Sequence, residues 1–185
     1  NHVKEDGSGI ALVTDNIHAT RAMIDHLYAQ GARKIAFING PLDHYEARER
    51  QRGVIEALKD HGLEPAMLLP GDFTEQGGYL AGQELLKSGC KVDAIFAAND
   101  VTAIGCMYAM NQAGLYAPKD FLLAGFDCIP LSGYITPRLT TMRVNVRQMG
   151  ERAIHLLMQK ISGELQGDVC ESRHPELVVR ESTQK

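Results

Sequence analysis

Short apolar runs alternate along the chain with longer stretches in which apolar residues recur every three or four positions. Continuous apolar runs predict buried strands of a parallel sheet, and the longer period predicts amphipathic helices. Strands are predicted at 34–39, 67–70, 94–98, 121–126, 140–144 and 176–179, the last at an edge. Helices are predicted at 16–31, around 54–62, at 79–89, 100–114 and 149–161. This alternation predicts an α/β fold: a parallel sheet flanked by helices.

Small and polar residues mark the ends of the predicted elements. Glycines follow four of the helices: Gly31, Gly62, Gly89 and Gly114. Glycine takes the left-handed conformation of a helix end without strain. Asp100 is predicted to cap the helix that it begins, which leaves Asn99 available at the strand end. Prolines predict a loop or short turn at 129–139, and polar residues predict a loop at 163–172.

Three predicted strands end on a polar residue, in the runs IAFINGPL, DAIFAAND and FLLAGFD. The carboxyl ends of parallel strands lie along one edge of a sheet, where ligands of such folds bind. We therefore expect Asn99, Asp127 and the loop after Asn39 to converge on one crevice that binds a small polar molecule.

Arg50 is the most informative single residue, because it shares a helix face with Val54 and Leu58 and begins the core-facing stripe. A buried arginine needs a partner. It could pair with Glu46 one turn earlier, or it could present its guanidinium to ligand oxygens. The spacing alone leaves both interpretations open.

The other candidate residues also have two interpretations each. Asp127 could cap a turn or contact a ligand, and Phe73 could belong to the core or stack on an apolar ligand face. His44 lies in a loop after a strand, where a solvated histidine is the simplest interpretation.

Composition narrows the classes of protein. The chain has 185 residues and a net charge of −4, without the basic stripe that binding to phosphates needs, so direct nucleic-acid binding by this stretch is not expected. No apolar run approaches the roughly 20 residues of a membrane span. Residues 1–10 have neither the basic and then apolar layout of a signal peptide nor an initiator methionine, so we expect a piece of a longer chain. Four widely spaced cysteines predict reduced thiols and a cytoplasmic location, with Cys170 exposed.

Motifs of catalysis and metal binding are weak in this sequence. Gly7-Ser8-Gly9 is a bare G-x-G without the third glycine of a dinucleotide fingerprint, and no P-loop or nucleophile elbow is present. The seven histidines have no metal-ligand spacing. We therefore predict no enzyme, no metal and no cofactor.

The helix at 101–113 carries two apolar stripes, so it is expected to be covered on two sides. One side would pack on the sheet, and the other on a second subunit or on more of the same domain.

Several blocks together resemble a known family. They are VTDN, GARKIAFINGPL, ARERQRGVIEAL, GDFTEQGGYLAG, DAIFAANDVTAIG, LLAGFD, PRLTTMRV and LVVREST. In order and spacing they are similar to the effector-binding domain of the lactose/galactose repressor (LacI/GalR) family, over essentially the whole chain. The resemblance implies a periplasmic-binding-protein-like fold, in which two α/β lobes hold a sugar or nucleobase between them.

The resemblance also implies a division of the chain. Residues 1–143 would be the second lobe with its lead-in, residues 144–173 the strand and helix that return to the first lobe, and residues 174–185 a final edge strand and tail. The DNA-binding head and nearly all of the first lobe would be missing.

Ligand contacts carry over from the family by position, onto His44, Glu46, Arg50, Phe73, Asn99 and Asp127. Glu46 is larger and more acidic than the hydroxyl residue of some relatives, and Val144 replaces a polar contact, so the identity of the ligand stays open.

The implied function is that of an effector sensor of a transcription regulator, which acts by lobe closure and is not an enzyme. The resemblance implies a homodimer through the helix at 101–113, operator DNA bound only through the missing head, and no membrane. The alternative is a periplasmic sugar-binding protein of a transport system, which has the same fold and a similar cleft.

Overall fold

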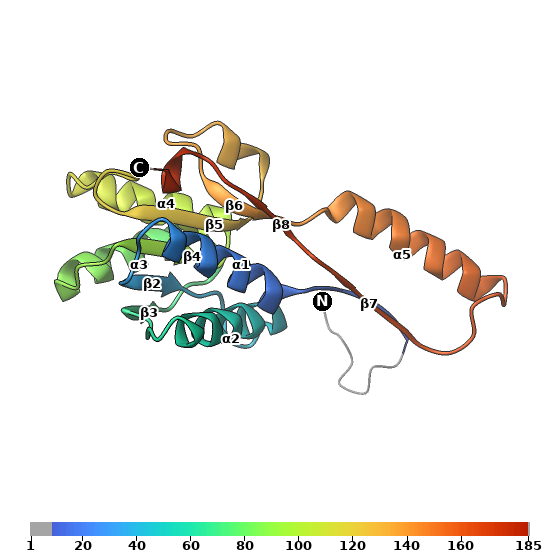
Figure 1. Cartoon of the computed structure of the whole chain (residues 1–185). Coiled ribbons are helices and arrows are strands. Elements are labelled where there is room, and N and C mark those ends of the chain that lie inside the picture. Colours follow the sequence, from blue (N-terminus) through green and yellow to red (C-terminus); the bar gives the residue numbers. More distant parts are fainter. Residues whose placement is uncertain (1–8, 185) are drawn as a thin grey trace.

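The main body is a six-stranded sheet within residues 9–184, the part of the chain that the computed structural model describes (Figure 1). In spatial order its strands are β3 (Met67–Leu69), β2 (Ile35–Ile38), β4 (Ala94–Ala97), β5 (Leu122–Asp127), β6 (Thr140–Arg143) and β8 (Glu176–Val178). All neighbours are parallel except β6 and β8, which are antiparallel. The predicted parallel sheet with a last edge strand is confirmed. Gly7, Ser8 and the start of the predicted lead-in lie outside the described residues.

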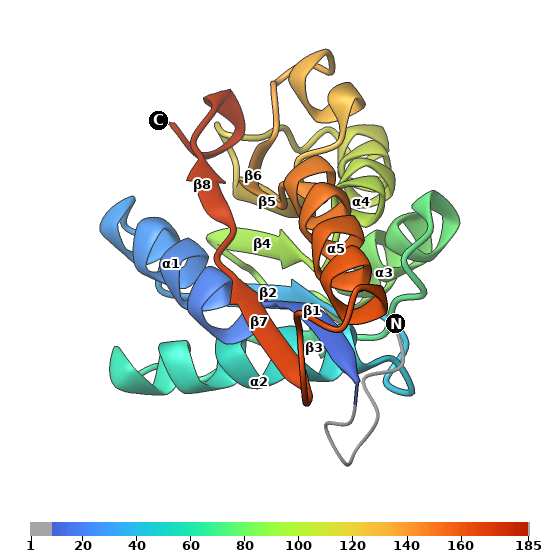
Figure 2. The same cartoon turned by 90° about the vertical axis from the view of Figure 1, so that its right-hand side faces the viewer.

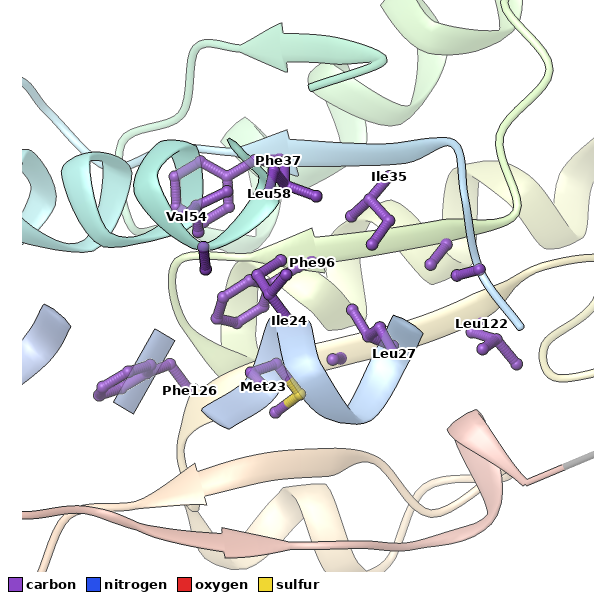
Figure 3. Close-up of a cluster of buried hydrophobic side chains, with 14 of the residues drawn as sticks. Met23, Ile24, Leu27, Ile35, Phe37, Val54, Leu58, Phe96, Leu122 and Phe126 are labelled. Carbon is purple, nitrogen blue, oxygen red and sulfur yellow. The ribbon is translucent and has the colours of Figure 1, made fainter. Parts of the chain in front are cut away.

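Helices cover both faces of this sheet. They are α1 (Asn16–Ala29), α2 (Tyr45–Asp60), α3 (Glu75–Ser88) and α4 (Asp100–Gln112). One apolar cluster joins α1 and α2 to the sheet, with Phe37, Phe96 and Phe126 from three neighbouring strands at its centre (Figure 3). A second cluster joins α3 and α4 to the opposite face through Ile38, Ile95 and Leu123. Burial on both faces explains why these strands read as continuous apolar runs.

Three further elements extend away from the main body (Figures 1 and 2). Strands β1 (Ile10–Thr14) and β7 (Val169–Arg173) form a parallel two-stranded sheet, beside α5 (Val146–Ile161). Only Leu156 is buried on α5. Large apolar side chains are exposed along it: Val146, Ile154, Leu157, Met158 and Ile161. Short 3-10 helices lie at Pro130–Gly133 and Glu181–Thr183.

The predicted elements agree with the structure to within one to three residues at most ends, but the loop predicted at 163–172 is wrong in its second half. Residues Val169–Arg173 form β7, and the predicted lead-in contains β1. Both strands lie in a two-stranded sheet in which none of their residues is fully buried. The sequence of β7, VCESR, therefore carries no apolar run, whereas the short apolar run of β1, IALVT, was not predicted as a strand. Cys170 is exposed, as predicted.

Close packing of α3 against α4 depends on two glycines. A Cβ atom at Gly78 would overlap the backbone carbonyl of Thr102, and one at Gly105 would overlap that of Glu75. The two helix backbones therefore approach each other more closely than any side chain would permit.

Gly78→Ala is expected to lower the free energy of unfolding by about 1–3 kcal/mol, because the added methyl group must push α3 away from α4. Gly150→Ala on α5 is the matched control, since a Cβ there meets open space. Its expected effect is stabilisation by up to about 1 kcal/mol, from helix propensity alone. Urea unfolding of both variants measures the difference. Equal effects would contradict the close approach.

Candidate functional site

The carboxyl ends of β2, β4 and β5 meet at one edge of the sheet, as parallel pairing requires. Each strand runs into a loop or a helix start there: Asn39 after β2, Asn99 after β4 and Asp127 at the end of β5. Helix α2 begins at Tyr45 after the β2 loop, so its first turns lie beside the same edge. The predicted convergence of these segments is therefore present.

Arg50 lies at the centre of this edge and is 6% exposed. The face that it shares with Val54 and Leu58 packs on the sheet, which carries the guanidinium inward. Its Nε donates to Oδ1 of Asn16 at 2.9 Å, and its Nη1 donates to the carbonyl of Ala98 at 2.5 Å. The guanidinium carbon also lies 3.7 Å from the centroid of the Phe126 ring.

The anionic partner of Arg50 is Asp127 and not Glu46. Nη2 of Arg50 lies 3.4 Å from Oδ1 of Asp127, so the simple pair with Glu46 on the same helix is not formed. Burial raises the pKa of Asp127, and the nearby Arg50 charge opposes that rise. Burial also lowers the pKa of Arg50, against the effect of Asp127 and Glu46. The Asp127 side chain is still 37% exposed, so this half of the pair faces solvent.

Asn16 is a site residue that sequence reasoning missed. It is 2% exposed and connects Arg50 to Glu46, since its Oδ1 accepts from Arg50 while its Nδ2 donates to Oε2 of Glu46 at 3.2 Å. The same Nδ2 donates to the carbonyl of Thr14. Its position at a predicted helix start indicated a cap only, and its partners Glu46 and Arg50 lie 30 and 34 residues away.

Phe73 forms one wall of the edge and is partly buried against the α1 and α2 side of the core. Its ring occupies the space that a Cβ atom at Gly40 would need. The ring of His44 lies 5.9 Å from it, edge to face, and His44 is otherwise exposed. Nδ2 of Asn99 donates to the carbonyl of Phe73 at 3.1 Å and so holds the loop in place.

The prediction that Asp100 caps α4 is wrong. Oδ1 of Asn99 accepts from the backbone N–H of Thr102, which makes Asn99 the cap of α4. Asp100 is fully buried and accepts hydrogen bonds from Thr141 Oγ1 at 2.5 Å and from the N–H of Ile129 at 2.8 Å. A Cβ atom at Gly125 would overlap its Oδ1, so glycine there makes room for the carboxyl group.

Backbone strain is concentrated at this edge. Within residues 9–184, the non-glycine residues with positive φ are Phe73 at 63°, Asp127 at 102° and Cys128 at 58°. Such conformations cost on the order of 1–3 kcal/mol each and are typical of ligand-binding segments. Two of the three were predicted as site residues.

The arrangement is suited to hydrogen bonding, and neither a nucleophile–base pair nor a metal centre is formed by these residues. The described residues contain no cluster of three or more His, Cys, Asp or Glu side chains that could hold a metal ion. None of the helices within residues 9–184 is long and apolar enough to cross a membrane.

The chain is similar to known proteins over nearly its whole length. A family described as "Periplasmic binding protein-like domain" matches residues 24–183. The HTH-type transcriptional repressor PurR of Pasteurella multocida (strain Pm70) is 34% identical over 166 residues, which are 89% of this chain and 48% of PurR. The HTH-type transcriptional repressor CytR of Escherichia coli (strain K12) is 33% identical over 171 residues, which are 91% of this chain and 50% of CytR. The chain thus spans about half the length of these curated relatives.

Solved structures of transcription regulators have the same fold. The Lac repressor dimer bound to operator and the anti-inducer ONPF superposes with a TM-score of 0.90 at 28% identity, over 94% of this chain and 52% of that chain. The transcriptional regulator CelR in complex with cellobiose gives a TM-score of 0.89 at 32% identity, over 95% of this chain and 54% of that chain.

Asp100 predicts how stability depends on pH. Burial raises the pKa of its carboxyl group to about 6, although the hydrogen bonds from Thr141 and Ile129 oppose the rise. The folded protein therefore holds this proton more tightly than the unfolded chain. The contribution of Asp100 to stability falls as pH rises from about 4 through about 6, where the penalty for the buried charge becomes complete.

Asp100→Asn removes this titration, so the stability of the variant relative to the natural chain is expected to rise between pH 4 and pH 7, by about 2 kcal/mol. Urea unfolding at several pH values measures the difference. Asp43→Asn, which removes an exposed carboxylate, is the control substitution. A constant difference between Asp100→Asn and the natural chain across this range would contradict the assignment.

Proposed function

We propose that this chain senses a small polar effector for a transcription regulator, because it belongs to the periplasmic-binding-protein-like domain family and, within it, to the effector-binding domains of the lactose/galactose repressors. The observation that carries the proposal is the buried Arg50 paired with the half-exposed Asp127 at the carboxyl edge of the sheet. Both groups can hydrogen-bond a ligand there, and Phe73 offers a ring beside them.

The charges favour a neutral effector with several hydroxyl groups. The single guanidinium of Arg50 is surrounded by the carboxyl groups of Asp127, Glu46 and Asp100. An anionic ligand would meet more negative than positive charge at this edge. The carboxylates instead suit ligands that donate hydrogen bonds, so we propose a sugar or a nucleoside. His44 and Asn99 complete the proposed contact set, with Asn99 acting mainly through Phe73.

Lobe closure is the mechanism that we propose for signalling. Helix α1 to strand β6 and the final strand would form one lobe, after a lead-in whose strand β1 pairs with β7. Residues 144–173 would belong to the other lobe, together with the rest of the longer protein. The effector would bind between the lobes and favour one arrangement over another. The exposed apolar face of α5 supports this division.

DNA binding would belong to another part of the longer protein, as the net charge of −4 suggests, and effector binding would alter it through the lobes. We also propose a cytoplasmic location and no catalytic activity, because PurR and CytR are both named as repressors. These names do not favour the alternative of a periplasmic transport protein.

A homodimer through α4 is part of the proposal. Tyr108 on α4 is 60% exposed and lies 5.8 Å, between ring centroids, from Tyr79 on α3. Together with Ile104 and Gly105 they line a hollow of about 380 Å³, which is mostly apolar. Exposed aromatic residues around an apolar hollow are typical of interface hot spots.

Arg50→Ala in the full-length protein is expected to weaken effector binding by about 2–5 kcal/mol, because it removes a buried charged contact and leaves Asp127 unpaired. Calorimetric titration with cellobiose, galactose, ribose, adenosine and cytidine identifies the ligand and measures the loss. Arg52→Ala is the matched control, since Arg52 lies on the same helix but, among residues 9–184, forms its ion pairs with Glu49 and Glu56 and not with Asp127. Unchanged affinity in Arg50→Ala would remove Arg50 from the site.

Tyr108→Glu is expected to raise the dissociation constant of the dimer by about 30-fold or more, as for loss of an aromatic hot spot. Light scattering coupled to gel filtration measures the fraction of dimer across a dilution series. Leu68→Glu places the same charge on an exposed apolar position of β3 and is expected to leave the dimer unchanged. If Leu68→Glu dissociated the dimer and Tyr108→Glu did not, the interface would lie elsewhere.

A further inference from the structure

The hydrogen bonds of Asn16 join two parts of the molecule that the proposed function treats separately. On one side are Arg50 and Glu46, which come from the first two turns of α2 at the candidate site. On the other side is the segment Thr14–Asn16, where the chain passes from β1 to α1. A single buried amide group contacts both sides.

Each polar atom of the Asn16 side chain has a defined partner. Oδ1 accepts from Nε of Arg50, which orients the plane of the guanidinium, and Nδ2 donates to Oε2 of Glu46 and to the carbonyl of Thr14. Only an amide supplies an acceptor and a donor at once in this geometry. An aspartate would keep the bond from Arg50 but would face the Glu46 carboxylate with a second negative charge.

The position of Asn16 is itself tightly fixed. Thr20 Oγ1 donates to its backbone carbonyl at 2.8 Å, and a Cβ atom at Gly53 would overlap the same Thr20 hydroxyl. Glycine at position 53 therefore lets α1 and α2 approach closely, which brings Asn16 within reach of Arg50. This packing leaves the amide little freedom to choose other partners.

The segment on the other side of Asn16 connects the two sheets. The N–H of Asp15 donates to the carbonyl of Arg173 at 2.8 Å, and Oδ2 of Asp15 lies 3.0 Å from Nδ1 of His174. Residues 173–176 lead from β7 to β8, so two of the connections between the main body and the β1–β7 sheet are held together beside Asn16, and the third leads from β6 to α5. A displacement of Arg50 or Glu46 would therefore be transmitted through the Asn16 side chain to the connection between β1 and α1.

We infer that Asn16 is a positioning residue: it fixes the Arg50 guanidinium and the Glu46 carboxylate for the effector and couples them to the β1–α1 crossing. This inference rests on the proposed function and adds a residue that touches no ligand itself. According to this inference, Asn16 sets the orientation of the Arg50 side chain before any effector binds. The inference can therefore be tested without knowing the effector.

The first arm of the test observes the Arg50 Nε–H group directly by ¹⁵N–¹H NMR of the full chain. Its resonance is assigned by its loss in Arg50→Lys. Asn16→Ala is expected to move this resonance to the position of exposed arginines and to speed its exchange with water, whereas Asn16→Asp keeps it near the original position. Asn145→Asp, at the start of α5, is the matched control and is expected to leave it unchanged. An unshifted resonance in Asn16→Ala overturns the inference.

The second arm exchanges donor and acceptor between Asn16 and Glu46. Asn16→Asp alone is expected to reduce the folding equilibrium constant by about 10- to 100-fold, because two carboxylates then face each other. The double variant Asn16→Asp, Glu46→Gln restores one donor opposite one acceptor and is expected to recover most of that loss. Additive effects of the two single changes would show that the pair does not interact and would overturn the inference.

Both arms are read without effector, so they separate this inference from the proposed function. If Asn16→Ala fails to fold, the single variant Asn16→Asp and the double variant Asn16→Asp, Glu46→Gln still test the inference. If both arms gave the expected results but no sugar or nucleoside bound, the proposed effector would be contradicted and the positioning role of Asn16 would stand.

Discussion

The burial of one guanidinium is the constraint on which the arrangement of this edge depends. Arg50 lies in the apolar layer between α2 and the sheet, where an unpaired charge would cost several kcal/mol. Its partners come from three separate segments: Asn16 at the start of α1, the Ala98 carbonyl after β4 and Asp127 at the end of β5. Satisfying this one side chain therefore fixes the mutual positions of α1, α2 and two strand ends.

The strands and helices of the main body could be predicted from the sequence, because each is marked by its own pattern of apolar residues and this pattern repeats along the chain. Strands β2, β4 and β5 are covered on both faces, and their sequences are therefore continuous apolar runs that can be recognised. Strands β1 and β7 have only each other in their sheet, so the sequence of β7, VCESR, carries no such signal. Pairing between positions 159 residues apart leaves no trace in the spacing of either segment.

The sequence placed Arg50 and Asp127 at the candidate site but left two uses open for each of them. Their mutual pairing could be seen only in three dimensions. Asp100 was predicted as the cap of α4 and Asn99 caps it instead, an error that arose because asparagine and aspartate are about equally good helix caps. What decided between them was the pocket behind Gly125, which accepts the Asp100 carboxyl group and leaves the cap to Asn99. Asn16 resembled an ordinary helix start, and its use depends on partners from α2.

The way in which Arg50 is held also supports the proposal of a neutral effector with hydroxyl groups. Two of its three nitrogen atoms, Nε and Nη1, already donate to protein acceptors, so the guanidinium cannot offer its full fork to a carboxylate or phosphate. The remaining nitrogen, Nη2, shares its outward side with Asp127 at 3.4 Å, a loose contact next to solvent. A hydroxyl group can insert there, accepting from Arg50 and donating to Asp127, without leaving either charge unpaired. A ligand that made this exchange would hold α2 and the end of β5 together from the open side of the edge.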